Sequence, residues 1–164
     1  MSDTLCRACG LCCDGTFFGS VVIEHAEADR LDRIRLPLFQ DGEELGMDQP
    51  CTALHDHQCS VYADRPTACA EYECELRKRV DSGERTLEEA EAHVITFRAL
   101  LVTLRDVFDC PAPASFWNKI LLLEEEGRGH GSGALSAEDY DLAATSVSHL
   151  LELGRTEFDA QFAF

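Results

Sequence analysis

Cysteine is the residue type in this sequence with the clearest chemical meaning. Four thiols lie in the stretch CRACGLCC, and four more follow before residue 75. A thiolate is a soft ligand that binds zinc and the iron of iron–sulfur clusters. Two residues between cysteines allow a tight turn to direct both sulfurs at one metal, and Gly10 can adopt the positive φ that such turns need. The candidate metal ligands are Cys6, Cys9, Cys12, Cys13, Cys51, Cys59, Cys69 and Cys74.

The spacing of these thiols suggests more than one metal centre. Eight thiols divide into two four-coordinate sites, or into one [4Fe–4S] cluster with four thiols left over. Adjacent side chains in extended backbone point to opposite faces. One ion that took both Cys12 and Cys13 would require a strained local turn, so we expect these two residues to serve different metal atoms. Thiols between residues 51 and 74 would then complete each shell.

A disulfide scaffold is the main alternative, and several features oppose it. The N-terminal stretch MSDTLCRACG has neither the basic region nor the apolar region of a secretory signal. We therefore expect a cytoplasmic, reducing location, where cysteine patterns usually indicate metal. The odd number of cysteines, 9, also fits poorly with complete pairing.

The net charge limits the classes of partner. The chain carries 14 basic and 31 acidic residues, a formal net charge of −17. This balance argues against nucleic-acid binding and against docking on an anionic membrane, and any protein partner is expected to be basic. The longest apolar runs, such as ITFRALLVTL, are short and contain Arg98, so no membrane span is expected.

The first half of the chain shows little periodic structure. Residues 1–20 are predicted to be a loop-rich cysteine segment, and residues 21–24 a short strand. A helix is predicted from His25 to Ile34, with Ala28, Leu31 and Ile34 on one face. Residues 37–85 have no sustained periodicity, so metal bonds are expected to supply their order.

The second half is predicted to be helical. Apolar residues recur at three–four spacing from Leu87 to Phe108, after a capping box of Thr86 and Glu89. A second helix is expected over residues 115–127, a glycine-rich linker over 127–133, and a third helix from a Ser136 cap to Gly154. Phe158, Phe162 and Phe164 could dock back onto these helices. The expected fold is mostly α with small α+β character, in which a metal-binding domain, 1–80, packs against a helical extension, 81–164.

The cysteine half resembles a known family. The motif C-x2-C-x2-C-C is followed by Pro50–Cys51, by C-x-V-Y from Cys59 to Tyr62, by R-P-x2-C from Arg65 to Cys69, and by Cys74. This pattern over residues 5–75 is similar to the CxxCxxCC cysteine-cluster family of the YkgJ type, described as zinc- or iron-chelating. The resemblance implies metal binding by all eight cysteines of the motif. The same cluster occurs in the flagellin lysine N-methylases, which this chain resembles in that part only.

A few other residues lie near the motif or outside it. Cys110 falls outside it and is predicted to be a buried free thiol. His55 and His57 could ligate metal, but a solvated loop is the favoured interpretation. Arg7, Arg65 and Arg77 are the nearest cations in sequence and are expected to compensate the negative charge of tetrathiolate sites. Tyr62 is expected in the core.

Three functions remain open from the sequence. The favoured one is a metal-binding protein, carrying an iron–sulfur cluster, which could be [4Fe–4S], or zinc, and non-catalytic alone. The second is an iron–sulfur redox or accessory component of an oxidoreductase or protein-methylating system. The third is a structural zinc module for protein–protein interaction. No dinucleotide fingerprint, methyl-donor glycine loop, catalytic triad or metalloprotease motif is found, so no catalytic residue is proposed.

Overall fold

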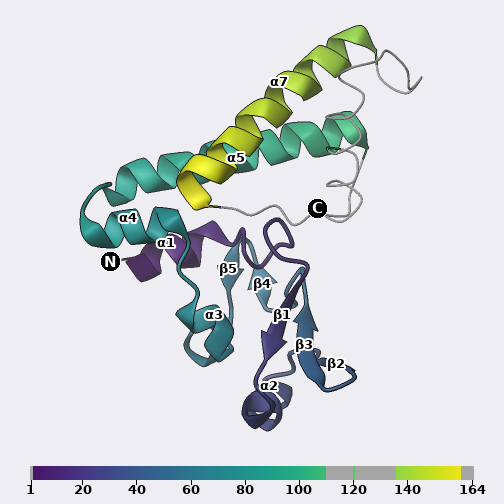
Figure 1. Cartoon of the computed structure of the whole chain (residues 1–164), viewed down its shortest axis with the longest axis vertical. Helices are drawn as coiled ribbons and strands as arrows, with labels where there is room; N and C mark the ends of the chain where they lie inside the picture. Colours follow the sequence, from purple (N-terminus) through teal and green to yellow (C-terminus); the bar gives the residue numbers. More distant parts are fainter. Residues whose placement is uncertain (1, 110–119, 121–135, 160–164) are drawn as a thin grey trace. The chain divides into compact units, whose positions relative to one another are not determined.

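Helices predominate in the described part of this chain, and two small sheets accompany them there. The computed structural model describes residues 2–109, 120 and 136–159, which form parts of two compact units, Met1–Leu87 and Glu88–Phe164 (Figure 1). The content of helix and strand confirms the predicted mostly α fold with small α+β character. The functional division into 1–80 and 81–164, and the packing of one half on the other, stay predictions.

The first unit begins with a helix that the sequence analysis missed. Helix α1 (Ser2–Cys9) occupies part of the segment predicted to be loop-rich, so that prediction was wrong. Leu5 is its buried apolar anchor, and one such residue in eight gives too little periodicity to reveal an amphipathic helix. The chain leaves α1 at Gly10, which adopts a φ of 66°.

A three-stranded antiparallel sheet follows. Strands β1 (Ser20–Ile23), β2 (Phe39–Asp41) and β3 (Glu44–Asp48) pair in the order β1-β3-β2. The strand predicted at 21–24 is confirmed within one residue, but the second and third strands were not expected. Phe39 pairs with Gly46 across the sheet. A Cβ atom at Gly46 would lie 2.4 Å from the Phe39 ring, so glycine is what allows the ring to cover the strand.

The helix predicted over residues 25–34 is confirmed as a short 3-10 turn, η1 (His25–Glu27), followed by α2 (Ala28–Arg33). Leu31 is fully buried, and Ala28 and Ile34 are partly buried against the same cluster. This core cluster consists of Ile23, Leu31, Leu36, Leu45, Met47, Cys51 and Ala53. One of the candidate metal ligands, Cys51, is therefore anchored in the apolar core.

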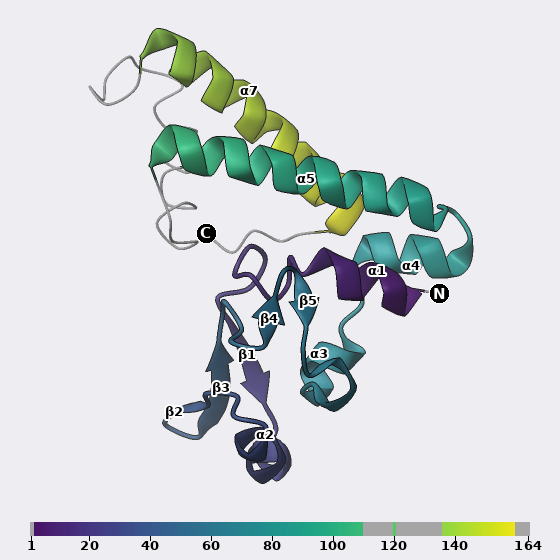
Figure 2. The same ribbon diagram turned by 180° about the vertical axis from the view of Figure 1, so that it is seen from behind.

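The segment predicted to be irregular contains several short elements. They are β4 (Leu54–His55), β5 (Gln58–Cys59), the 3-10 turn η2 (Tyr62–Asp64), α3 (Thr67–Glu71) and α4 (Glu75–Ser82). Elements of two to eight residues are too short for a periodic apolar pattern, which explains the error. Figure 2 shows α1 beside α4 and β5, and both pairs are in contact.

The described part of the second unit contains two long helices. Helix α5 (Leu87–Phe108) confirms the predicted helix, and its buried residues are Ala90, Val94, Phe97, Leu101, Leu104 and Phe108. Helix α7 (Ala137–Leu153) begins as predicted, because the Ser136 hydroxyl accepts a hydrogen bond from the Asp139 amide. Of the predicted second helix only Ile120 is described, and it is helical and buried. Cys110, the 127–133 linker, Phe162 and Phe164 lie outside the described residues.

Helix α7 ends at Leu153 with Gly154 as its C-cap residue, as predicted, but a turn that was not predicted follows it. The backbone stays helical at Gly154, with φ at −57°, and continues as a π-helical turn, η3 (Gly154–Phe158), to Asp159 in the left-handed region. This extension buries Phe158, whose ring centroid lies 5.1 Å from that of Phe97 in an edge-to-face contact. Burial of a large aromatic ring gains about 2 kcal/mol, which outweighs the weak preference of glycine to end a helix. Within the described residues, no helix has the length and apolar character needed to cross a membrane.

Candidate metal centre

Helix α1 and the turn after it present the first four thiols. Cys6 and Cys9 are three residues apart, so they share one face of α1. Gly10 then reverses the chain, and its carbonyl oxygen accepts from the amides of Cys13 and Asp14 at 2.9 and 3.0 Å. A Cβ atom at Gly10 would lie 2.9 Å from the backbone oxygen of His57, so this turn packs tightly against the β4–β5 hairpin.

The β4–β5 hairpin places Cys59 close to Cys51. Its central residues, Asp56 and His57, both have positive φ, the geometry of a type I′ turn. The Cys51 amide donates to the carbonyl oxygen of Cys13 at 2.7 Å, which joins the hairpin segment to the vicinal cysteine pair. His55 and His57 are both exposed, in keeping with the interpretation that they are solvated loop residues.

The last two thiols lie at short helices. Cys69 is in the middle of α3. Cys74 is the N-cap residue of α4, and α4 contacts α1, with Cys74 near enough to act on Cys6. None of these eight cysteines forms a disulfide; Cys51 is buried and the other seven are partly buried.

Electrostatic interactions gather the thiols around Cys12 and around Cys13, two groups that meet at the vicinal pair because the charge of Cys13 also acts on Cys12. Burial raises the pKa of Cys12, and the charges of Cys9, Cys74, Cys13 and Cys6 raise it further. The pKa of Cys6 is likewise raised by burial and by Cys74. We call the group around Cys12 the first thiol set; its members are Cys6, Cys9, Cys12 and Cys74.

The neighbours of Cys13 are different. Burial raises the pKa of Cys13 to about 12, with further contributions from Cys51, Cys59 and Cys69. Burial also raises the pKa of Cys69 to about 11, and Cys51 and Cys59 add to the shift. We call this group the second thiol set; its members are Cys13, Cys51, Cys59 and Cys69. The two adjacent cysteines therefore belong to different sets.

Backbone amides favour the thiolate form at one residue of each set. Burial raises the pKa of Cys51, but the N–H groups of Ala53 and Leu54 oppose this shift. Burial raises the pKa of Cys74 in the same way, and the N–H groups of Leu76 and Arg77 oppose it. The amides are those two and three residues after the cysteine in both cases. Amides directed at a sulfur stabilise its charged form, which is the form that binds metal.

Each set also has an arginine beside it. Arg77 donates to Cys6 and lowers its pKa against the effect of burial, and the Arg77 side chain forms ion pairs with Asp3, Glu73 and Asp81 at 3.5 to 3.8 Å. Arg65 lowers the pKa of Cys69, though less than burial raises it. The placement of Arg65 and Arg77 fits the expected charge compensation.

Arg7 lies on the Tyr62 ring, with its guanidinium carbon 4.8 Å from the ring centroid. Arg65 is 3.8 Å from the same centroid. The Tyr62 hydroxyl donates to Asp3 at 2.9 Å; burial and this bond raise the pKa of Tyr62 to about 12. Tyr62 is only partly buried, so the expectation that it is a core residue was wrong.

The donor chemistry suits a soft or borderline metal. Each set offers four sulfurs, partly desolvated and mutually repulsive when charged, and a bound cation would remove that repulsion. As the side chains lie, however, no three His, Cys, Asp or Glu residues in the described parts of the chain are arranged closely enough to hold an ion. The sets are therefore groups of neighbouring thiols rather than closed coordination shells.

Sequence reasoning did not identify Glu27, whose carboxylate accepts hydrogen bonds from Arg30 and from Thr67, two residues before Cys69. Glu27 and Thr67 are 40 residues apart, and no spacing rule connects them.

Comparison with known proteins identifies a family for more than half of the chain. Residues 5–93 match the family model CxxCxxCC, described as "Putative zinc- or iron-chelating domain". The matched residues contain all eight cysteines of the two thiol sets. No curated protein and no solved structure matches the chain.

Proposed function

Because this chain belongs to the CxxCxxCC family of zinc- or iron-chelating domains, we propose that it is a metal-binding protein with two thiolate centres, one for each thiol set. The observation that supports the proposal is that eight partly or fully buried cysteines, none of them in a disulfide, gather around Cys12 and around Cys13. Four is the number of sulfur ligands that tetrahedral zinc and a [4Fe–4S] cluster both use. To close each shell, the thiols must turn towards one another as the metal binds.

An iron–sulfur cluster is the cofactor that we favour for the first thiol set. Cys6, Cys9 and Cys12 are each separated by two residues, a run more usual in iron–sulfur proteins than in zinc proteins. Zinc in both sets is the competing form. Either zinc or an iron–sulfur cluster, when bound, would cross-link distant parts of the first unit. An iron–sulfur cluster would also add the capacity to take up an electron. The chain's own residues would supply the thiolates, the backbone N–H groups that stabilise them, and the compensating charge of Arg65 and Arg77.

Metal analysis of protein purified without oxygen tests the proposal. We expect zinc or iron in amounts that fill both centres, and a brown colour if iron–sulfur clusters are present. Protein that contains neither metal, and takes up neither zinc nor iron with sulfide when reduced, would overturn it. The lack of catalysis by the chain alone, a basic protein partner and a cytoplasmic location remain further proposals, to be tested separately.

A further inference from the structure

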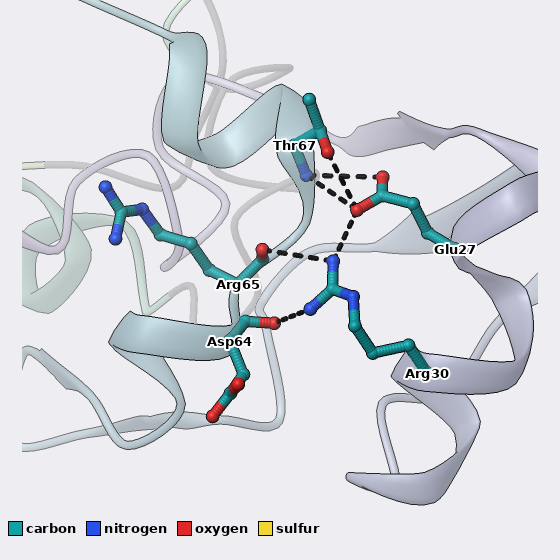
Figure 3. Close-up of polar contacts among 5 residues, drawn as sticks. All are labelled: Glu27, Arg30, Asp64, Arg65 and Thr67. Carbon is teal, nitrogen blue, oxygen red and sulfur yellow. Dashed lines mark hydrogen bonds and ion pairs between the residues drawn. The ribbon is translucent and has the colours of Figure 1, made fainter.

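A buried carboxylate lies outside both thiol sets. Glu27, at the end of η1, is 8% exposed, and Figure 3 shows its side chain directed at the start of α3. The Thr67 amide donates to both carboxylate oxygens, at 3.1 and 3.2 Å, and the Thr67 hydroxyl donates to Oε1 at 2.8 Å. A buried carboxylate is costly unless it is paired and hydrogen-bonded, and these bonds meet that need.

Arg30, one turn along α2, adds contacts to the same segment. Its guanidinium donates to the Glu27 carboxylate and to the carbonyl oxygen of Asp64. It also donates to the carbonyl oxygen of Arg65, at 3.4 Å (Figure 3). Glu27 and Arg30 together therefore fix the backbone from Asp64 to Thr67, the segment that leads into α3.

Helix α3 buries no residue of its own, although it lies against β1 and its N-cap residue Pro66 is buried. It is five residues long. A helix of this length is unstable by itself, since most helical stability in proteins comes from packing of an apolar face. Cys69 lies two residues beyond Thr67 on this helix, so the bonds from Glu27 and Arg30 at the start of α3 contribute to its position.

We propose that Glu27 and Arg30 are positioning residues, which hold α3 so that Cys69 faces Cys13, Cys51 and Cys59 in the second thiol set. This inference rests on the proposed function, because it assigns these residues a role in metal binding. Supporting interactions of this kind orient ligands, and their loss typically weakens metal binding about 10- to 100-fold.

Cobalt(II) titration of paired variants tests the inference. Cobalt is a spectroscopic substitute for zinc, and thiolate-to-cobalt absorption reports each bound sulfur. Cys12→Ser leaves only the second set intact, and Cys13→Ser leaves only the first. In the Cys12→Ser background, Glu27→Gln is expected to weaken cobalt binding about 10- to 100-fold and to alter the absorption bands. In the Cys13→Ser background the same change is expected to leave the affinity and the bands unchanged.

Two further variants sharpen the comparison. Glu24→Gln is the matched control, since Glu24 is exposed and three residues earlier, and it is expected to change neither site. Thr67→Ala removes the hydroxyl but keeps the backbone amide, so a smaller, still selective loss is expected. Thr67→Ser keeps the hydroxyl, so it should bind cobalt as the protein with Thr67 does.

The outcomes separate the inference from the proposed function. If wild-type protein and both single cysteine variants bind no cobalt, the proposed function fails. If they bind but Glu27→Gln changes neither set, the positioning role is wrong while the proposed function stands. Equal losses in both sets would also overturn the inference, because Glu27 would then support the whole unit rather than the position of Cys69.

Discussion

The amide of Cys51 donates a hydrogen bond of 2.7 Å to the carbonyl oxygen of Cys13. This bond joins the vicinal cysteine pair to the second cysteine-bearing segment, since Cys51 lies 38 residues after Cys13. It places Cys13 on the side of Cys51, while Cys12 lies among thiols from α1 and the start of α4. The bond therefore accounts for how neighbouring residues enter different thiol sets.

The first prediction concerns this division. Cys12→Ser is expected to remove the metal of the first set alone, and Cys13→Ser that of the second set alone, because a serine hydroxyl is a poor ligand for a thiophilic metal. Each variant should retain about half of the wild-type metal, by elemental analysis, if both centres are of the same kind. Loss of all metal from both variants would show a single shared centre.

Cys110 supplies the matched control, since it is the one cysteine outside the family motif. Cys110→Ser should leave the metal content intact, whereas Cys9→Ser and Cys69→Ser should lower it. Metal loss in Cys110→Ser equal to that in the other two would show that the ligand set is wrongly assigned.

The sequence predicted those features of the fold that follow from a repeated apolar spacing or from the type of a single residue. Helix α5 was predictable because its apolar residues recur over 22 positions. The start of α7 was predictable because a serine N-cap acts locally. The candidate ligands followed from residue type, and Gly10 from its position between cysteines.

Features that depend on long-range contacts were not predictable. The β4–β5 hairpin turns at Asp56 and His57, without the glycine that usually marks a type I′ turn. The π-helical turn η3 follows α7 and lets Phe158 pack on Phe97, a contact that no local rule anticipates. Glu27 bonds to Thr67 across 40 residues, and only the folded chain brings them together.

A second prediction concerns the turn at Gly10. Alanine there would adopt an unfavourable positive φ and would also press its Cβ against the His57 carbonyl. We expect Gly10→Ala to lower the free energy of unfolding by about 1–3 kcal/mol and to weaken metal binding, measured by denaturation and by competition with a chelator.

Two other glycines allow the causes to be separated. Gly42 has a φ of 60° with nothing near its Cβ position, whereas Gly19 has neither a positive φ nor a close neighbour. The expected order of destabilisation is Gly10→Ala, then Gly42→Ala, then Gly19→Ala. A Gly10→Ala effect no larger than that of Gly42→Ala would show that the contact with His57 is unimportant.

The third prediction is a pH dependence that arises from Glu27. Burial acts to raise the pKa of this carboxyl, but the bonds from Thr67 and Arg30 outweigh it, so the pKa is lowered from its ordinary 4.5. In the unfolded chain this carboxyl takes up its proton as the pH falls through about 4.5, before the folded protein does. The stabilisation that the Glu27 carboxylate gives to the folded state is therefore complete above that pH. It is lost as the pH falls further, through the lowered pKa of the folded protein.

The comparison of wild type with Glu27→Gln isolates this effect, because acid release of metal affects both proteins. Near pH 7, Glu27→Gln should lower the free energy of unfolding by about 1.5–3 kcal/mol, the usual range for a hydrogen bond to a charged group. The difference should stay constant from pH 7 down to about 5 and shrink in more acidic solution. A difference that grows as the pH falls would contradict the lowered pKa.

The last prediction concerns metal removal. The first unit has small sheets, several helices of eight residues or fewer, and a core that includes Cys51. Structural metal contributes on the order of 10 kcal/mol or more to the folding of small domains. In the second unit, α5 and η3 share an apolar core that includes the Phe97–Phe158 contact. Removal of metal under reducing conditions should therefore unfold residues 1–80 first.

Limited proteolysis and hydrogen exchange, each followed by mass spectrometry, can assign the change to a part of the chain. After chelation, new cleavage sites and rapid exchange should appear within residues 1–80, while the amides of α5 stay protected. Zinc or iron with sulfide should restore the original pattern, and Cys12→Ser with Cys13→Ser in one chain should reproduce the chelated state. If residues 1–80 keep their protection after complete metal loss, the apolar core alone holds the first unit, and the metal centres serve chemistry rather than folding.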